Sequence, residues 1–90
     1  MPSYLAEIEV MLKPLVNDPQ GLAVLDGLKN LGFDGAERVR VGKRIEITLD
    51  AATPAEAETA VTEMCQQLLA NPVIEEFRFD LAEVSASAGD

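Results

Sequence analysis

The chain of 90 residues has no histidine, no tryptophan and only one cysteine. Histidine is the commonest general base and metal ligand near neutral pH, so we expect no metal site and no histidine-based catalysis. A single cysteine cannot form an internal disulfide and is typical of a reducing compartment. The sequence shows no signal-peptide pattern and no apolar run near the ~18 residues that cross a membrane. We therefore expect a cytoplasmic protein.

Basic residues are also scarce: the chain has 7 basic and 16 acidic residues, and its formal net charge is −9. An acidic surface repels phosphates, which argues against nucleic acid as the main partner. Four of the bases nevertheless lie close together in the sequence: Arg38, Arg40, Lys43 and Arg44. This basic cluster has two interpretations, a solvated strand edge that prevents aggregation or a contact for an acidic partner surface.

Residues 37–50, which contain the basic cluster, have the pattern of a β-hairpin. Apolar residues alternate with polar ones on both sides of Gly42-Lys43, and such alternation predicts strands with one buried face. A Gly-X pair suits a two-residue turn with positive φ at its first position. The apolar positions are Val39, Val41, Ile45, Ile47 and Leu49.

Two further strands are predicted by the same alternation. Residues 4–12 place Tyr4, Ala6, Ile8, Val10 and Leu12 on one face. Residues 73–84 contain a last strand in which Phe77, Phe79 and Leu81 alternate with Glu76, Arg78 and Asp80. Each strand therefore offers at least one apolar face to a core.

A first helix is predicted to begin at Asp18-Pro19-Gln20-Gly21. Asp18 can accept hydrogen bonds from the first turn, and Pro19 suits the first helical position. Val24, Leu25, Leu28 and Leu31 follow at helical spacing, and Gly32 is expected to end the helix in a left-handed cap. The loop has a second interpretation, in which this helix N-terminus receives an anion or the backbone of a partner.

A second helix is predicted over residues 54–70. Thr53 and Glu56 form a capping box around Pro54. The apolar stripe consists of Ala57, Ala60, Val61, Met64, Leu68 and Leu69. Asn71 is expected to adopt a left-handed cap, and Pro72 prevents the helix from continuing.

The predicted order of elements is β-α-β-β-α-β. This order favours an α+β two-layer sandwich of the ferredoxin-like type, with two helices on one face of an antiparallel sheet. We expect a single domain over residues 1–84, followed by a disordered tail over residues 85–90. The uncovered face of the sheet is a natural surface for self-association or docking.

No group of residues has the spacing of a catalytic site. The sequence contains neither a phosphate-binding loop nor a dinucleotide fingerprint. Cys65 lies within the second apolar helix, where a small buried residue is the expected role, and no histidine is present to activate it. We therefore expect no catalytic residues in this chain.

Four stretches together resemble the PurS family, the small subunit of phosphoribosylformylglycinamidine synthase. The first is Asp18-Pro19-Gln20-Gly21, which opens the first helix, and the second is Leu31-Gly32-Phe33, which closes it. The third is Val39-Arg40-Val41-Gly42-Lys43, followed by Ile45-Glu46. The fourth is residues 64–75, ahead of an aromatic strand. Their order and spacing fit the family over residues 3–84.

The resemblance implies a subunit that is not itself catalytic. It implies a homodimer, or a tetramer, that joins a glutaminase subunit to a large synthetase subunit in purine biosynthesis. The complex converts formylglycinamide ribonucleotide, glutamine and ATP into the formylglycinamidine, glutamate, ADP and phosphate. ATP and Mg are expected on the synthetase subunit, with no cofactor on this chain. Contacts with the larger subunits are expected at Arg38, Arg40, Lys43 and Arg44, and at the loop of Asp18, Gln20 and Gly21.

The main alternative is a stand-alone regulatory domain that binds a small ligand. ACT domains, which sense amino acids, share the β-α-β-β-α-β order and have an Asp-x-Pro-Gly-Leu loop similar to Asp18-Pro19-Gln20-Gly21-Leu22. The proline and glycine spacing differs here. Acylphosphatases also share the order, but residues 13–17 contain none of the glycine or arginine of their phosphate loop.

Overall fold

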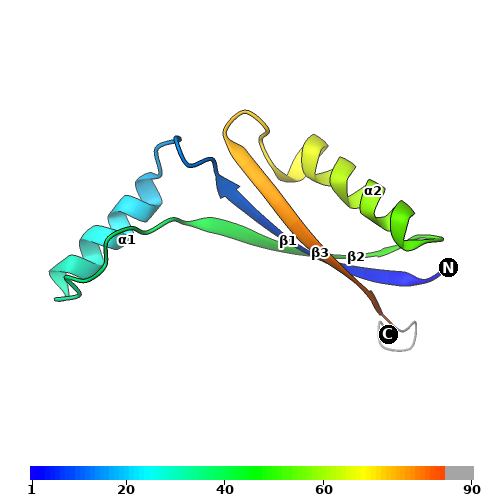
Figure 1. Ribbon diagram of the computed structural model, residues 1–90, viewed down its shortest axis with the longest axis horizontal. Coiled ribbons are helices and arrows are strands. Elements are labelled where there is room, and N and C mark those ends of the chain that lie inside the picture. Colours follow the sequence, from blue (N-terminus) through cyan, green and yellow to red (C-terminus); the bar gives the residue numbers. More distant parts are fainter. Residues whose placement is uncertain (85–90) are drawn as a thin grey trace.

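The computed structural model describes residues 1–84, which form a three-stranded antiparallel sheet and two α-helices. The strands are β1 (Ser3–Leu12), β2 (Gly42–Asp50) and β3 (Glu75–Val84), in the order β2-β1-β3 (Figure 1). The predicted α+β class with an antiparallel sheet is confirmed. The expected disordered tail lies outside the described residues and stays a prediction.

The hydrophobic core lies between β1 and α2 (Pro54–Met64). As its alternation predicted, one face of β1 is buried at Tyr4, Ala6, Ile8 and Val10, whereas Leu12 at the end of this face is half-buried. Ala57, Val61 and Cys65 of the second helix bury their side chains against this face. The flanking strands pack against the same core with their apolar residues half-buried: Ile45, Ile47 and Leu49 from β2, and Phe77, Phe79 and Leu81 from β3.

The second helix ends in a π-turn, η1 (Cys65–Leu69), in which the Ala70 amide donates to the Cys65 carbonyl at 3.0 Å. The wider turn rotates the end of the helix, and Leu68, predicted for the apolar stripe, is 83% exposed. The predicted left-handed cap at Asn71 is wrong, because no non-glycine residue among residues 1–84 has positive φ. Asn71 instead accepts from the Val73 amide through its side chain, in an Asx-turn at 3.0 Å.

The predicted hairpin over residues 37–50 is wrong. β2 starts at Gly42, and residues 37–41 are extended but belong to no strand. Gly42 makes no turn, and within residues 1–84 only Gly32 has positive φ. Gly42 lies opposite Met11 at the end of β1. A Cβ there would be 2.0 Å from the Met11 sulfur and 2.6 Å from the Val10 carbonyl oxygen. Glycine is therefore needed for close approach to β1.

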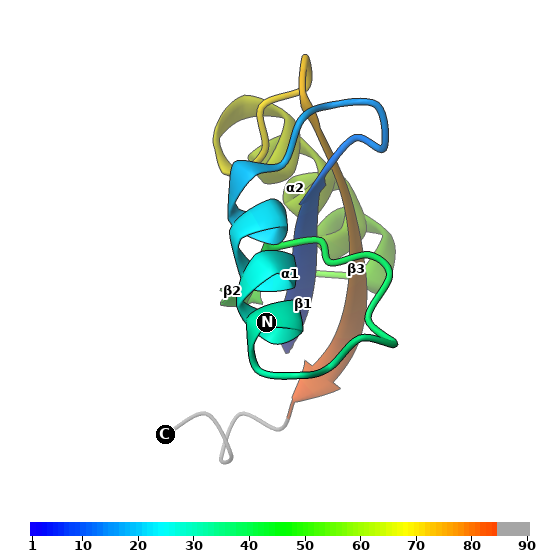
Figure 2. The ribbon, with the colours of Figure 1, turned by 90° about the vertical axis from the view of Figure 1, so that its left-hand side faces the viewer.

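The helix α1 (Pro19–Asn30) leaves the sheet instead of covering it. Together with residues 31–41 it forms a projection, here called the arm, that extends beyond one end of the sheet (Figure 1). In the view along the length of the molecule, α1 lies in front of the strands (Figure 2). No arm residue belongs to either core cluster. The radius of gyration is 17.1 Å, whereas a compact chain of this length has a value of about 12 Å. Of the two predicted helices, only α2 packs on the sheet of its own chain.

The caps of both helices follow the sequence signals. The Thr53 hydroxyl accepts from the Glu56 amide at 3.1 Å, which is the Thr53 half of the predicted capping box. At the end of α1, the Phe33 amide donates to the Leu28 carbonyl at 3.0 Å around Gly32, whose φ is 97°. This pattern is the Schellman motif, which confirms the predicted glycine cap.

The close approach at Gly42 gives a stability prediction. Gly42→Ala should lower the free energy of unfolding by about 1–3 kcal/mol, because the new methyl group collides with the backbone of β1. Gly27→Ala is the matched control, since a Cβ at Gly27 in α1 meets nothing within 4 Å and alanine favours a helix. Urea unfolding at equal protein concentration measures both. Equal stability of Gly42→Ala and the unsubstituted chain would contradict the prediction.

Candidate functional site

The base of the arm is organised by one carboxylate, that of Asp18. Its Oδ1 accepts from the Gly21 amide at 2.9 Å, which caps α1 as predicted. Its Oδ2 accepts from the Val41 amide, also at 2.9 Å, where the chain returns to the sheet. The hydrogen bonds from Val41 and Gly21, with the charge of Arg40, lower the pKa of Asp18 against the opposing effect of desolvation. A single side chain therefore joins the two ends of the arm.

Two more of the predicted contact residues reinforce this junction. The guanidinium of Arg40 donates to the Leu12 carbonyl at the end of β1. Gly21 is buried, and a Cβ on it would lie 2.4 Å from the Val39 carbonyl oxygen. Gln20, the next residue in the predicted loop, is exposed. The structure therefore places Asp18, Gly21 and Arg40 at an internal junction, and Asp18 itself occupies the place where an external anion would bind the helix.

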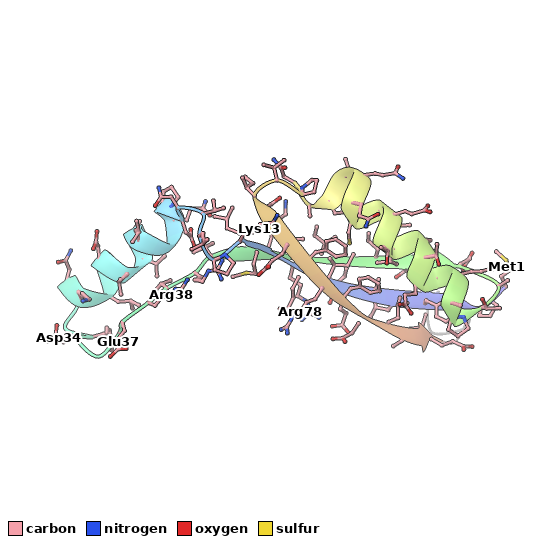
Figure 3. The ribbon with its side chains drawn as sticks, turned by 45° about the horizontal axis from the view of Figure 1, so that its top comes forward. Met1, Lys13, Asp34, Glu37, Arg38 and Arg78 are labelled. Atoms are coloured by element: carbon pink, nitrogen blue, oxygen red, sulfur yellow. The ribbon has the colours of Figure 1, made fainter. Side chains whose placement is uncertain are left out.

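The four basic residues do not form one cluster in space. Arg38 lies on the arm (Figure 3) and is exposed. Lys43, also exposed, is in β2 opposite Val10. Arg44 lies on the sheet face away from α2, where it pairs with Glu7 and, at 2.8 Å, with Glu46. The hydrogen bond to Glu46 and the charge of Glu7 raise the pKa of Arg44. Of the four, Arg38 and Lys43 remain available to a partner.

The open face of the sheet has a charge pattern that the sequence analysis missed. Arg44 and Arg78 flank Glu9 in one cross-strand row, and Glu46 and Asp80 flank Glu7 in the next. Arg78 pairs with Glu9 at 3.0 Å and points away from the sheet on this face (Figure 3). Opposed carboxylates destabilise a sheet, and Arg44, which pairs with both Glu7 and Glu46, offsets the repulsion between those two. Only the register, which alternation does not specify, brings these residues together.

Apolar surface is exposed on the arm and on the sheet face that α2 covers. Val24 in α1 is 46% exposed, Leu31 at the C-cap of this helix is 76% exposed, and Phe33 beyond it is 60% exposed. On the sheet, α2 packs over β1 and β3, which leaves the apolar side chains of β2 half-covered. Exposed apolar surface of this extent on a small protein is typical of an interaction site.

The remaining candidate groups give no separate site. Burial raises the pKa of the Cys65 thiol, as expected for an unreactive core cysteine. Within residues 1–84 no three histidine, cysteine, aspartate or glutamate side chains are grouped to hold a metal ion. In the same part of the chain, no helix is long and apolar enough to cross a membrane.

A small α+β protein with a projecting arm and uncovered apolar surface belongs to the class of assembly subunits. The family model described as PurS, phosphoribosylformylglycinamidine (FGAM) synthase, matches residues 5–83. The chain therefore belongs to the PurS family, which supplies a subunit of FGAM synthase. This match supports the subunit prediction and not the ACT-like alternative.

Known relatives agree with this assignment along almost the whole chain. The chain is 47% identical over 85 residues to the synthase subunit PurS of Synechocystis sp., covering 94% of this chain and 85% of the relative. The structure of Thermus thermophilus PurS matches with a TM-score of 0.81 and 44% identity, covering 93% and 100% of the two chains. A chain of PurLQS from Thermotoga maritima also matches with a TM-score of 0.81, at 30% identity, covering 93% and 100%.

The lowered pKa of Asp18 gives a prediction for pH. The ionised Asp18 carboxylate stabilises the native state fully at pH values above its pKa in the unfolded chain, about 3.9. This stabilisation is lost as the pH falls through the lower pKa of Asp18 in the native state. We expect the Asp18 carboxyl to titrate below the ordinary aspartate range, and the Val41 amide signal to shift with it. A carbon-detected NMR titration measures both. An ordinary Asp18 pKa, or a Val41 amide that does not follow it, would contradict the hydrogen bonds described here.

Proposed function

We propose that this chain is a non-catalytic bridging subunit of FGAM synthase. It holds a glutaminase subunit and a large synthetase subunit together, so that ammonia released at one active site reaches the other. The overall reaction consumes formylglycinamide ribonucleotide, glutamine, ATP and water, and forms formylglycinamidine ribonucleotide, glutamate, ADP and phosphate. ATP and Mg belong to the synthetase subunit in this proposal, and the complex works in the cytoplasm.

The observation that supports this proposal most strongly is the match to the PurS family over residues 5–83. The similar Thermotoga maritima chain comes from PurLQS, which names three subunits. Fixing two active sites in one assembly raises the local concentration of a shared intermediate above its bulk value. A bridging subunit performs that task with its surfaces alone.

The chain is proposed to act as a homodimer in which each arm packs on the other protomer. The sheet has one covering helix, over β1 and β3, and its β2 side is half-covered. The arm has exposed apolar residues and packs on neither core cluster of its own chain. Placing α1 of a second copy over Ile45, Ile47 and Leu49 buries both surfaces at once. It also completes the two-helix layer that the sequence predicts.

The proposed function is tested by reconstituting the synthase with and without this chain. Omitting the chain should abolish glutamine-dependent synthesis and leave ammonia-dependent synthesis intact, because only the first requires the two active sites to communicate. Product formation is followed with each nitrogen donor in turn. Equal glutamine-dependent rates with and without the chain would refute the bridging role.

Charge reversal in the same assay locates the contact with the larger subunits. Arg38→Glu with Lys43→Glu should reduce glutamine-dependent synthesis about tenfold or more, because each change replaces attraction by repulsion at an acidic partner surface. Arg40 is left unchanged, since it holds the base of the arm. Lys29→Glu is the control, a basic residue of the last turn of α1 outside the cluster.

The arm-exchange dimer is tested by adding charge to the apolar side of α1. Val24→Glu with Leu31→Glu should convert the dimer to a monomer at micromolar concentration, because burying either carboxylate in the interface is costly. Both positions are exposed in the single chain, so its circular dichroism spectrum should not change. Sedimentation velocity measures the mass. Lys29→Glu, which lies about 140° around the helix from Val24, is the control, and a stable Val24→Glu, Leu31→Glu dimer would refute the arrangement.

A further inference from the structure

The arm is attached to the rest of the chain through very few contacts. Residues 13–18 connect α1 to the end of β1, and residues 31–41, the rest of the arm, lead from α1 to the start of β2. No residue of α1 packs in either core cluster, so core packing does not fix the direction of the helix. Its direction depends on the hydrogen bonds at its base.

Those hydrogen bonds converge on Asp18, whose two oxygens bind amides that are 20 residues apart in the chain. Gly21 is in the first turn of α1, and Val41 is the residue before β2. An ordinary N-cap needs only the first of these bonds. The second bond joins the start of the helix to the strand that follows the arm, and it has no role in capping.

The surroundings of Asp18 favour one geometry of this junction. The Gly21 backbone lies against the Val39 carbonyl, so closely that a Cβ on Gly21 would be 2.4 Å from that oxygen. The Arg40 guanidinium bonds the Leu12 carbonyl on the neighbouring strand. Lys13 is bound in turn to the loop before β3, through its amide to the Ile74 carbonyl at 2.8 Å and its ammonium to the Pro72 carbonyl at 2.9 Å. Hydrogen bonds therefore connect the junction to the end of β1 through Arg40 and to the loop before β3 through Lys13.

We propose that Asp18 is a positioning residue that joins the two ends of the arm and thereby sets the direction in which α1 leaves the sheet. Its importance for assembly rests on the proposed function, in which the arm packs on a second copy of the chain. An arm held in one direction meets its partner surface without the loss of conformational entropy that a swinging arm undergoes. Asp18 thus favours association without itself touching the partner.

The test separates the capping role of Asp18 from the joining role. Asparagine and serine are both good N-caps, but each side chain has only one oxygen that can accept the local bond from Gly21. Asp18→Asn and Asp18→Ser should therefore keep α1 helical and leave the Val41 amide without its partner. The matched control is Thr53→Asn, which changes the N-cap of α2, where the side chain bonds only the Glu56 amide.

Two measurements are made on the full chain, amide hydrogen exchange and self-association on dilution. For both Asp18 variants we expect exchange at Val41 to be faster by about 10- to 100-fold, as the loss of a hydrogen bond to a charged group implies. We expect the dimer dissociation constant to rise about tenfold or more, with helix content unchanged. Thr53→Asn should change neither quantity.

The outcomes distinguish this inference from the proposed function. Unchanged Val41 exchange in both Asp18 variants overturns the positioning role, whatever happens to assembly. Faster Val41 exchange with an unchanged dissociation constant confirms the joining role and overturns its effect on assembly. The arm-exchange dimer itself is judged separately, by the Val24→Glu, Leu31→Glu variant. A loss of helix content in both variants, although asparagine and serine keep the N-cap, shows that the bond to Val41 is needed for the helix itself and not for its direction, which also overturns the inference.

Discussion

Burial along the central strand is the constraint on which the rest of the structure depends. Ile8 and Val10 of β1 are fully enclosed by Val61 and Cys65 from the covering helix, and both outer strands align on β1. One helix is too narrow to cover three strands, so the apolar side chains of β2 and β3 stay half-exposed. A chain of this size with an unfinished core gains stability by association. The arm is the part of the same chain that does not pack against this core.

The open face of the sheet, away from α2, is charged and takes no part in the core. Arg44 pairs with the opposed acids Glu7 and Glu46, and Arg78 pairs with Glu9 in the neighbouring row. These ion pairs are exposed and contribute little to stability individually. They make this face of the sheet polar. The surfaces suited to close apolar packing are therefore the sheet face beside α2 and the apolar side of the arm.

Local signals in the sequence predicted the elements well. Asp18 and Thr53 cap the two helices, Gly32 ends the first, and alternation identified the buried faces of β1 and β3. Each of these depends on residues within a few positions of one another. The hairpin failed because the pattern around Gly42 fits two structures equally well, a turn or a tight strand contact, and the choice depends on Met11 in a distant strand. Among the predicted contact residues, Asp18 and Arg40 are hydrogen-bonded to backbone groups distant in the sequence, and Gly21 lies against the Val39 carbonyl. Their contact with the larger subunits stays a prediction.

The sequence by itself determined where the helices start, which residues each strand buries and that no histidine chemistry is present, because these follow from short-range geometry and composition. Only the tertiary structure decided that residues 37–41 are part of an arm, that Asp18 joins the two ends of that arm, and that Arg44 lies on the open face of the sheet. These outcomes depend on contacts between residues far apart in the chain. A hydrogen bond such as that from Val41 to Asp18 leaves no periodic signal, because its two partners meet only once the strands have taken their register.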